Sequence, residues 1–82
     1  MKIRINIALK KGVLDTQGKA IENSLHNNLG FNQISGVRQG KSVELNIDET
    51  DMKKVEKIID EICDKLLVNQ VIESHSFEVI EN

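Results

Sequence analysis

Few side chains in this sequence could carry out catalysis. Cys63 is the single cysteine of the 82 residues, and it falls on the apolar side of a helical pattern, where free thiols are usually buried and inert. His26 and His75 are far apart, and no pair of His, Cys or acidic residues has the spacing of a metal site. We expect His26 to be solvated on a helix and His75 to serve packing or partner contact. The sequence therefore predicts no catalytic, cofactor-binding or metal-binding residue.

The basic segment 36–41, GVRQGK, is the stretch best suited to contact an anion. It lacks the spacing of a phosphate-binding P-loop, and it leads into a predicted strand instead of a helix. Two interpretations remain open. The segment forms a hairpin with a basic tip, or Arg38 and Lys41 contact a phosphate or an acidic partner.

Composition argues against several classes of protein. The formal net charge is −2 and the isoelectric point is near 5.6, which does not suit a general binder of nucleic acid or acidic membranes. The expected central strands carry no aromatic residue on which RNA bases could stack. No apolar run approaches the roughly 20 residues of a membrane span, and the N-terminus lacks a signal-peptide core. A single cysteine cannot form an internal disulfide. These features predict a cytoplasmic protein without nucleic-acid or membrane partners.

The segment Asp51–Val68 gives the strongest structural signal. Apolar residues recur in it at steps of three and four, as on the buried face of an α-helix, and charged residues occupy the other face. Thr50 or Asp48 is expected to cap its start, and Asn69 to end it in a left-handed conformation. The residues expected to be buried are Met52, Val55, Ile59, Ile62 and Leu66, flanked by Ile58, Cys63 and Leu67.

The remaining pattern predicts one more helix and four strands. Asp15 is a suitable N-cap for a helix over 16–29, and Gly30 fits its C-terminal stop. The segment 39–41 is expected to form a tight turn, and Gly36 to mark a bulge in the strand before it. The expected strands span 2–10, 33–39, 42–48 and 74–80.

The element order βαββαβ predicts the fold class. Two βαβ halves joined by a hairpin form a ferredoxin-like α+β fold, with a four-stranded antiparallel sheet and both helices on one face. The cleanly alternating strands 2–10 and 42–48 would lie at the centre of that sheet. We expect residues 1–82 to form one domain. Its open sheet face and two edge strands favour self-association.

Three segments carry a family resemblance: VLDTQGKAI at 13–21, VRQGKSVEL at 37–45 and CDKLLVNQVIE at 63–73. Read together, they resemble the PurS family, the small subunit of phosphoribosylformylglycinamidine synthase. Their order and spacing match the family pattern across essentially the whole chain. Thr16 and Gln70 stand where the family commonly has proline, and His75 replaces a usual tyrosine.

The resemblance implies a function that needs no catalytic group in this chain. The family is a non-catalytic subunit of a cytoplasmic purine-biosynthesis complex. In that complex a synthetase subunit uses ATP to convert formylglycinamide ribonucleotide to its amidine, and a glutaminase subunit releases ammonia from glutamine. The small subunit, a homodimer, brings the two together and supports ammonia transfer, while ATP and glutamine are used by the partners. The alternative is a free-standing regulatory module that binds a small ligand.

By position, the resemblance also implies roles for individual residues. Asp15 and Gly18 would shape the start of the first helix. Gly40 would shape the hairpin, and Asn69 the exit from the second helix, in each case through cap or turn geometry. The expected partner contacts are Arg38, Lys41, Glu73 and His75.

Overall fold

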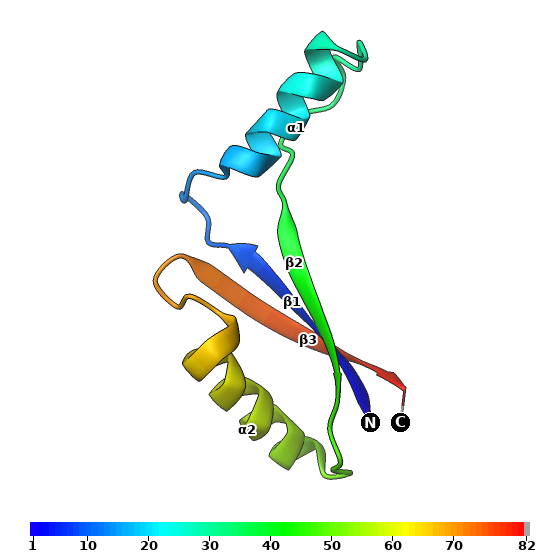
Figure 1. The fold of residues 1–82 in the computed structure, drawn as a ribbon, viewed down its shortest axis with the longest axis vertical. Helices are drawn as coiled ribbons and strands as arrows, with labels where there is room; N and C mark the ends of the chain where they lie inside the picture. The colour runs from blue at the N-terminus through cyan, green and yellow to red at the C-terminus, as the bar shows by residue number, and fades with distance from the viewer. Residues whose placement is uncertain (82) are drawn as a thin grey trace.

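The computed structural model describes residues 1–81 as an α+β fold built on an antiparallel sheet (Figure 1). The elements are, in order, β1 (Lys2–Leu9), α1 (Thr16–Asn27), β2 (Gly40–Asn46), α2 (Met52–Ile62), a π-helical turn (Cys63–Leu67) and β3 (Glu73–Glu81). β1 lies between β2 and β3 and pairs with both in antiparallel orientation. The α+β class is therefore confirmed, but the sheet of residues 1–81 has three strands and not four.

The core lies between one face of the sheet and α2. The alternation of β1 turns Ile3, Ile5 and Ile7 toward this face, where they are 0–3% exposed. α2 contributes Val55 and Ile59, which are fully buried, as its apolar spacing predicts. The opposite face of the sheet is open and carries polar side chains.

The start of α2 differs from the expected one. Its N-cap is Asp51, whose carboxylate accepts the N–H of Lys53 at 3.0 Å, and not Thr50 or Asp48. Because the cap must directly precede the first helical residue, its position follows from the start of the helix at Met52.

A π-helical turn ends this helix. The N–H of Val68 donates to the carbonyl of Cys63 at 3.0 Å, so the turn holds one residue more than an α-helical turn. The extra residue rotates the buried face. Leu66, expected in the core, is 82% exposed, and Leu67 packs against the core instead. Cys63 is buried, as predicted.

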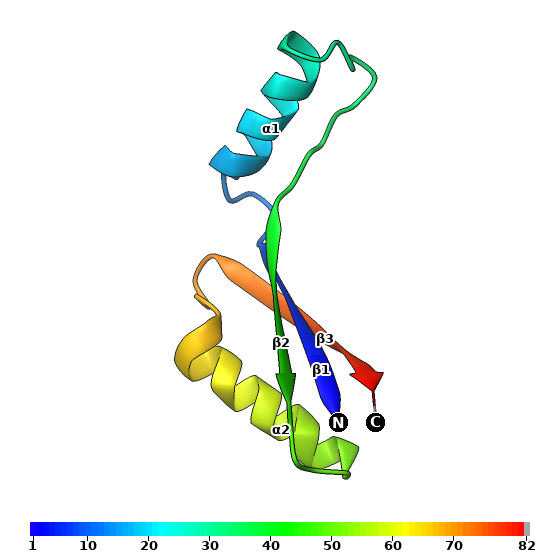
Figure 2. The same cartoon turned by 45° about the vertical axis from the view of Figure 1, so that its right-hand side comes forward.

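α1 lies beyond the end of the sheet and does not cover it (Figures 1 and 2). Gly18 is its only buried residue, and the molecule extends 48 Å along its longest axis. The expectation that both helices pack on one face of the sheet is therefore wrong. The cause lies in the segment 34–39, which runs straight into β2 instead of pairing with it. The expected strand at 33–39, its bulge at Gly36 and the turn at 39–41 do not form.

The C-terminal end of α1 follows the expected signal. Gly30 has a φ of +76°, and the N–H of Phe31 donates to the carbonyl of Leu25 at 2.8 Å, so the chain folds back on the helix. The helix is shorter than the predicted 16–29. Neither helix of residues 1–81 is long and apolar enough to cross a membrane.

Candidate partner interface

Three backbone stretches meet where α1 joins the sheet: Leu9–Asp15, Arg38–Lys41 and Asn69–Glu73. We call this region the neck. The N–H of Lys10 donates to the carbonyl of Ile72 at 2.7 Å, and the Lys10 ammonium donates to the carbonyl of Gln70 at 2.7 Å. These bonds attach the end of β1 to the loop before β3, so the neck is part of the folded unit.

Asp15 joins the start of α1 to the start of β2. One carboxylate oxygen accepts the N–H of Gly18 at 2.8 Å, and the other accepts the N–H of Gln39 at 2.7 Å. The side chain is only 6% exposed. The Gln39 N–H, followed by the Gly18 N–H, holds the pKa of Asp15 below its ordinary value. Asp15 is therefore the predicted N-cap, and it also makes a second contact that its sequence context does not indicate.

Gly18 and Gly40 stand where a side chain would collide with backbone. A Cβ on Gly18 would lie 2.6 Å from the carbonyl oxygen of Val37, and a Cβ on Gly40 would lie 2.7 Å from that of Ile7. Neither glycine has a positive φ. Both are therefore required by close approach of the backbone, and not by turn conformation.

Arg38 holds the loop between β1 and α1. Its guanidinium donates to the carbonyls of Leu9, Lys10 and Val13, each at 3.3 Å, and its Nε is 4.0 Å from the Asp15 carboxylate. The side chain is nonetheless half-exposed. Arg38 thus has an internal role in the neck, and contact with a partner stays a prediction.

Lys41 and Glu73 form an ion pair at the other side of the neck. Nζ of Lys41 lies 3.0 Å from a Glu73 oxygen, and the other Glu73 oxygen accepts the N–H of Asn69 at 2.8 Å. The Asn69 N–H, and then Lys41, hold the pKa of Glu73 below its ordinary value. Glu73 is 10% exposed and Lys41 64%, so Lys41 is the accessible member of the pair.

Asn69 shapes the exit from α2 by hydrogen bonds. Its side-chain oxygen accepts the N–H of Val71 at 3.1 Å, and its carbonyl accepts those of Ile72 and Glu73. The left-handed conformation predicted for Asn69 is wrong, because all positive φ angles in residues 1–81 belong to glycines.

His75 lies outside the neck. It pairs with Ile7 across the sheet and so faces α2, where its Nε2 is 3.4 Å from a carboxylate oxygen of Asp60. The imidazole is 20% exposed. The predicted residues that the fold brings together at the neck are Asp15, Gly18, Arg38, Gly40, Lys41, Asn69 and Glu73.

Sequence reasoning did not identify Gln39 and Glu22 as members of this region. Gln39 takes part through its backbone N–H, so its residue type gives no signal. Glu22 accepts the N–H of Val37 at 3.0 Å and thereby joins α1 to the returning segment. The one feature of the sequence that indicates this role of Glu22 is its place one helical turn before His26. The ring of His26 contacts the carbonyl of Ile34, which belongs to the same returning segment as Val37.

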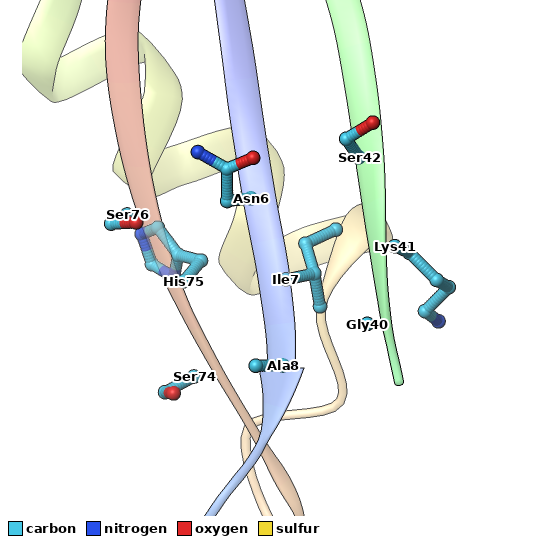
Figure 3. A pocket seen from close by; sticks show the side chains of 9 residues that line it. All are labelled: Asn6, Ile7, Ala8, Gly40, Lys41, Ser42, Ser74, His75 and Ser76. Atoms are coloured by element: carbon cyan, nitrogen blue, oxygen red, sulfur yellow. The ribbon is translucent and has the colours of Figure 1, made fainter. Parts of the chain in front are cut away.

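A shallow hollow of about 470 Å³ lies next to the neck. Figure 3 shows small side chains from all three strands along it, with Lys41 and His75 at its sides. The open-face residues that line it are Asn6, Ala8, Gly40, Ser42, Ser74 and Ser76. The hollow is wide and shallow, so it suits a broad protein contact better than an enclosed ligand.

The buried polar side chains of this structure bond within the chain. Within residues 1–81, every buried side-chain nitrogen or oxygen has a hydrogen-bond partner. In the same part of the chain, no three His, Cys, Asp or Glu side chains are grouped to hold a metal ion. The sheet face and one side of α1 stay uncovered. These features define a small α+β protein with two uncovered surfaces, the open face of its sheet and one side of α1.

Comparison with known proteins identifies the family. The family model PurS, described as phosphoribosylformylglycinamidine (FGAM) synthase, matches residues 2–81. The chain belongs to the PurS family, and the resemblance read from its three segments is confirmed.

Relatives from different organisms support the same family assignment. The chain is 40% identical over 80 residues to the phosphoribosylformylglycinamidine synthase subunit PurS of Bacillus subtilis, covering 98% of this chain and 93% of that protein. It is 43% identical over 70 residues to the same subunit of Mycobacterium leprae, covering 84% of this chain and 82% of that protein.

Solved structures agree as well. The chain superposes on the B. subtilis PurS structure with a TM-score of 0.84 and 40% identity, over 98% of both chains. It superposes on a chain of the PurLQS structure from Thermotoga maritima with a TM-score of 0.84 and 30% identity, over 94% of this chain and 93% of that one.

Proposed function

We propose that this chain is the non-catalytic assembly subunit of phosphoribosylformylglycinamidine synthase in de novo purine biosynthesis. The observation that carries the proposal is the match to the PurS family over residues 2–81, together with the likeness to a chain of PurLQS. In this role the chain brings the glutaminase and synthetase subunits together and supports the transfer of ammonia between them.

In this proposal the other two subunits of the complex carry out its chemistry. The synthetase subunit uses ATP, the glutaminase subunit uses glutamine, and the present chain binds neither. The use of the charged groups of the neck in internal hydrogen bonds supports this division. The chain acts in the cytoplasm as one PurS-like domain and forms a homodimer or a larger assembly.

The partner surface includes the neck and the hollow beside it. Among the four predicted contact residues Lys41 is the most exposed, at 64%, and it suits a carboxylate of a partner. Arg38, Glu73 and His75 complete the proposed contact. Because Arg38 and Glu73 also hold the neck together, they would position this surface as well as touch a partner.

The alternative of a free-standing ligand-binding module is not favoured. The relatives described above are subunits of the same synthase, and the hollow is shallow.

Assembly can be tested by sedimentation of purified subunits. The chain is mixed with the synthetase and glutaminase subunits of the same organism, in the presence of ATP and glutamine. A species that contains all three subunits, and that does not form when this chain is omitted, is the expected result. Formation of the same synthetase–glutaminase complex without this chain would contradict the proposal.

A further inference from the structure

A hollow of about 390 Å³ lies at the base of α1, between the loop that enters this helix and the segment that enters β2 (Figure 2). We call it the loop hollow. The apolar side chains of Val13, Leu14 and Val37 line it, and Leu14 is 76% exposed. Two cations, Lys19 and Arg38, belong to the same lining. A hollow that combines apolar walls with a few charged groups has the composition of a recognition site.

The carboxylates that pair with these two cations are turned into the molecule. Glu22 lies 3.3 Å from Nζ of Lys19 and is 14% exposed, whereas Lys19 is 63% exposed. Asp15 lies 4.0 Å from Nε of Arg38 and is 6% exposed, whereas Arg38 is 48% exposed. Both carboxylates also accept backbone N–H groups of the segment before β2. The two pairs therefore present their positive charges to the solvent and direct their negative charges toward the backbone.

The sequence around the loop hollow is basic as well. Lys11 is exposed and directly precedes Gly12, which lines the hollow. Residues 1–48 contain seven Lys or Arg and four Asp or Glu, a net side-chain charge of +3, although the whole chain has a net charge of −2. The loop hollow thus lies in the basic part of an acidic protein. A local positive potential of this kind attracts acidic groups of a partner.

The bonds of Arg38 favour a carboxylate over a phosphate as the bound anion. Nη2 of Arg38 donates to the carbonyls of Leu9 and Lys10, and Nη1 donates to the carbonyl of Val13, each at 3.3 Å. Arginine binds phosphate best through two parallel N–H groups, and here those groups are already bonded to the backbone. A side-chain carboxylate needs only the charge and one donor, which Lys19 provides.

We propose that the loop hollow binds an acidic segment of a partner subunit. An Asp or Glu side chain of that segment contacts Lys19 and Arg38, and a neighbouring apolar side chain packs against Leu14. Lys19 and Leu14 are therefore partner contacts in addition to the residues of the neck. This inference rests on the assembly role proposed above and states the chemistry of one of its contacts.

Charge reversal tests the polar half of this contact. Lys19→Glu reverses one cation of the loop hollow, and Lys53→Glu makes the same change of net charge at the start of α2, which lies away from α1 (Figure 1). Both lysines are exposed. The measured quantity is the concentration of this chain at which half of the synthetase subunit sediments in the three-subunit species. Lys19→Glu should raise it about tenfold, because like charges then face each other, and Lys53→Glu should raise it less than about twofold.

Truncation of two exposed leucines tests the apolar half. Leu14 and Leu66 are 76% and 82% exposed, so replacing either by alanine should change the melting temperature of the isolated chain little. Leu14→Ala should raise the half-assembly concentration about fivefold, because the apolar contact made on binding is lost. Leu66→Ala is the matched control and should leave it unchanged. If Lys19→Glu lowers the melting temperature, this pair of variants decides the test.

The three-subunit experiment separates a failure of this inference from a failure of the proposed function. If the unmodified chain forms no three-subunit species, the assembly role fails and this inference fails with it. If the unmodified chain forms that species, and Lys19→Glu and Leu14→Ala form it at the same concentration, the loop hollow binds no partner segment. In that case the assembly role stands and this inference alone is overturned.

Two measurements on the isolated chain exclude other occupants of the loop hollow. Lys19→Glu should leave the sedimenting mass of the isolated chain unchanged; a change of mass would mean that the hollow contacts a second copy instead. Sodium phosphate should not raise the melting temperature above its value in sodium chloride of equal ionic strength. A rise that Lys19→Glu abolishes would mean that the hollow holds a free anion, and would overturn the inference.

Discussion

The carboxylate of Asp15 accepts the backbone N–H of Gln39 at 2.7 Å, across the junction between α1 and β2. The same carboxylate caps α1 through the N–H of Gly18. One side chain thus fixes both the start of the helix and the point where the chain enters the sheet. The orientation of α1 relative to the sheet depends on this pair of bonds, because Gly18 is the only buried residue of α1.

The folded chain should lose stability at acid pH because the carboxylates of Asp15 and Glu73 become protonated. The pKa values of Asp15 and Glu73 are lower in the folded chain than their ordinary values of 3.8 and 4.5. The unfolded chain therefore binds protons more readily, and stability declines as the pH falls from above these ordinary values through the folded pKa values. Asp15→Asn should reduce stability at neutral pH and flatten the acid decline, as measured by urea unfolding between pH 7 and pH 3. An unchanged acid decline in this variant would contradict the assignment.

Gly18→Ala should destabilise the chain by about 1–3 kcal/mol, the usual cost of forcing atoms into a filled space. A Cβ at this position would lie 2.6 Å from the carbonyl oxygen of Val37, so α1 and the segment before β2 must move apart. Gln17→Ala is the matched control in the same helical turn, where the side chain is exposed and the change should stay within about 0.5 kcal/mol. Urea unfolding of both variants measures the difference. Equal stabilities would mean that the two segments are not in close contact.

The π-helical turn makes a prediction that separates two adjacent leucines. Leu67 packs against the core, whereas Leu66 is 82% exposed. Leu67→Ala should cost about 1–3 kcal/mol, less than a fully buried leucine would, and Leu66→Ala should cost less than about 0.5 kcal/mol. Thermal unfolding of the isolated chain measures both. A larger loss for Leu66→Ala would indicate a regular α-helix through this segment, or a second surface that covers Leu66.

Lys41→Ala tests the proposed partner contact without disturbing the neck. The ammonium is exposed, and its partner Glu73 keeps the bond from the Asn69 N–H, so the melting temperature should change little. Binding to the two partner subunits should weaken about tenfold, as measured by titration calorimetry. Arg38→Ala is the companion variant; it should also lower stability, because it removes three bonds to backbone carbonyls. Normal binding by the Lys41 variant would exclude this residue from the contact.

The parts of the fold that depend on local pattern could be predicted from the sequence. The alternation of Ile3, Ile5 and Ile7 identifies β1 and its buried face, and the capping signal of Asp15 identifies the start of α1. The spacing of Val55 and Ile59 identifies α2. In each case the signal lies within a few residues, where hydrophobic period and capping geometry act.

The placement of α1 could not be predicted in the same way. The stripe of Ile21, Leu25 and Leu29 marks an apolar side of the helix, but it does not show where that side lies relative to the sheet. Gly40 allows a tight turn, and it equally allows the close approach to Ile7 that the extended chain makes. Local sequence therefore favours a hairpin that the structure does not form.

Residue type alone does not predict the internal contacts of the neck. The charges of Arg38 and Glu73 predict contacts with a partner, and the structure adds that both side chains also bond to backbone groups of their own chain. Every residue type except proline has a backbone N–H, so a contact made by the N–H of Gln39 cannot be predicted from its residue type. Lys41 and Arg38 are exposed, as the sequence-based hypothesis assumes, whereas Glu73 is almost fully buried.

The most direct test of the account is the rate of glutamine-dependent amidine formation by the synthetase and glutaminase subunits of the same organism, with and without this chain. The account predicts that the rate rises steeply only when all three subunits are present. Activity with free ammonia in place of glutamine should depend much less on this chain, because that reaction needs no transfer between subunits. Equal glutamine-dependent rates with and without the chain would contradict its role as the assembly subunit.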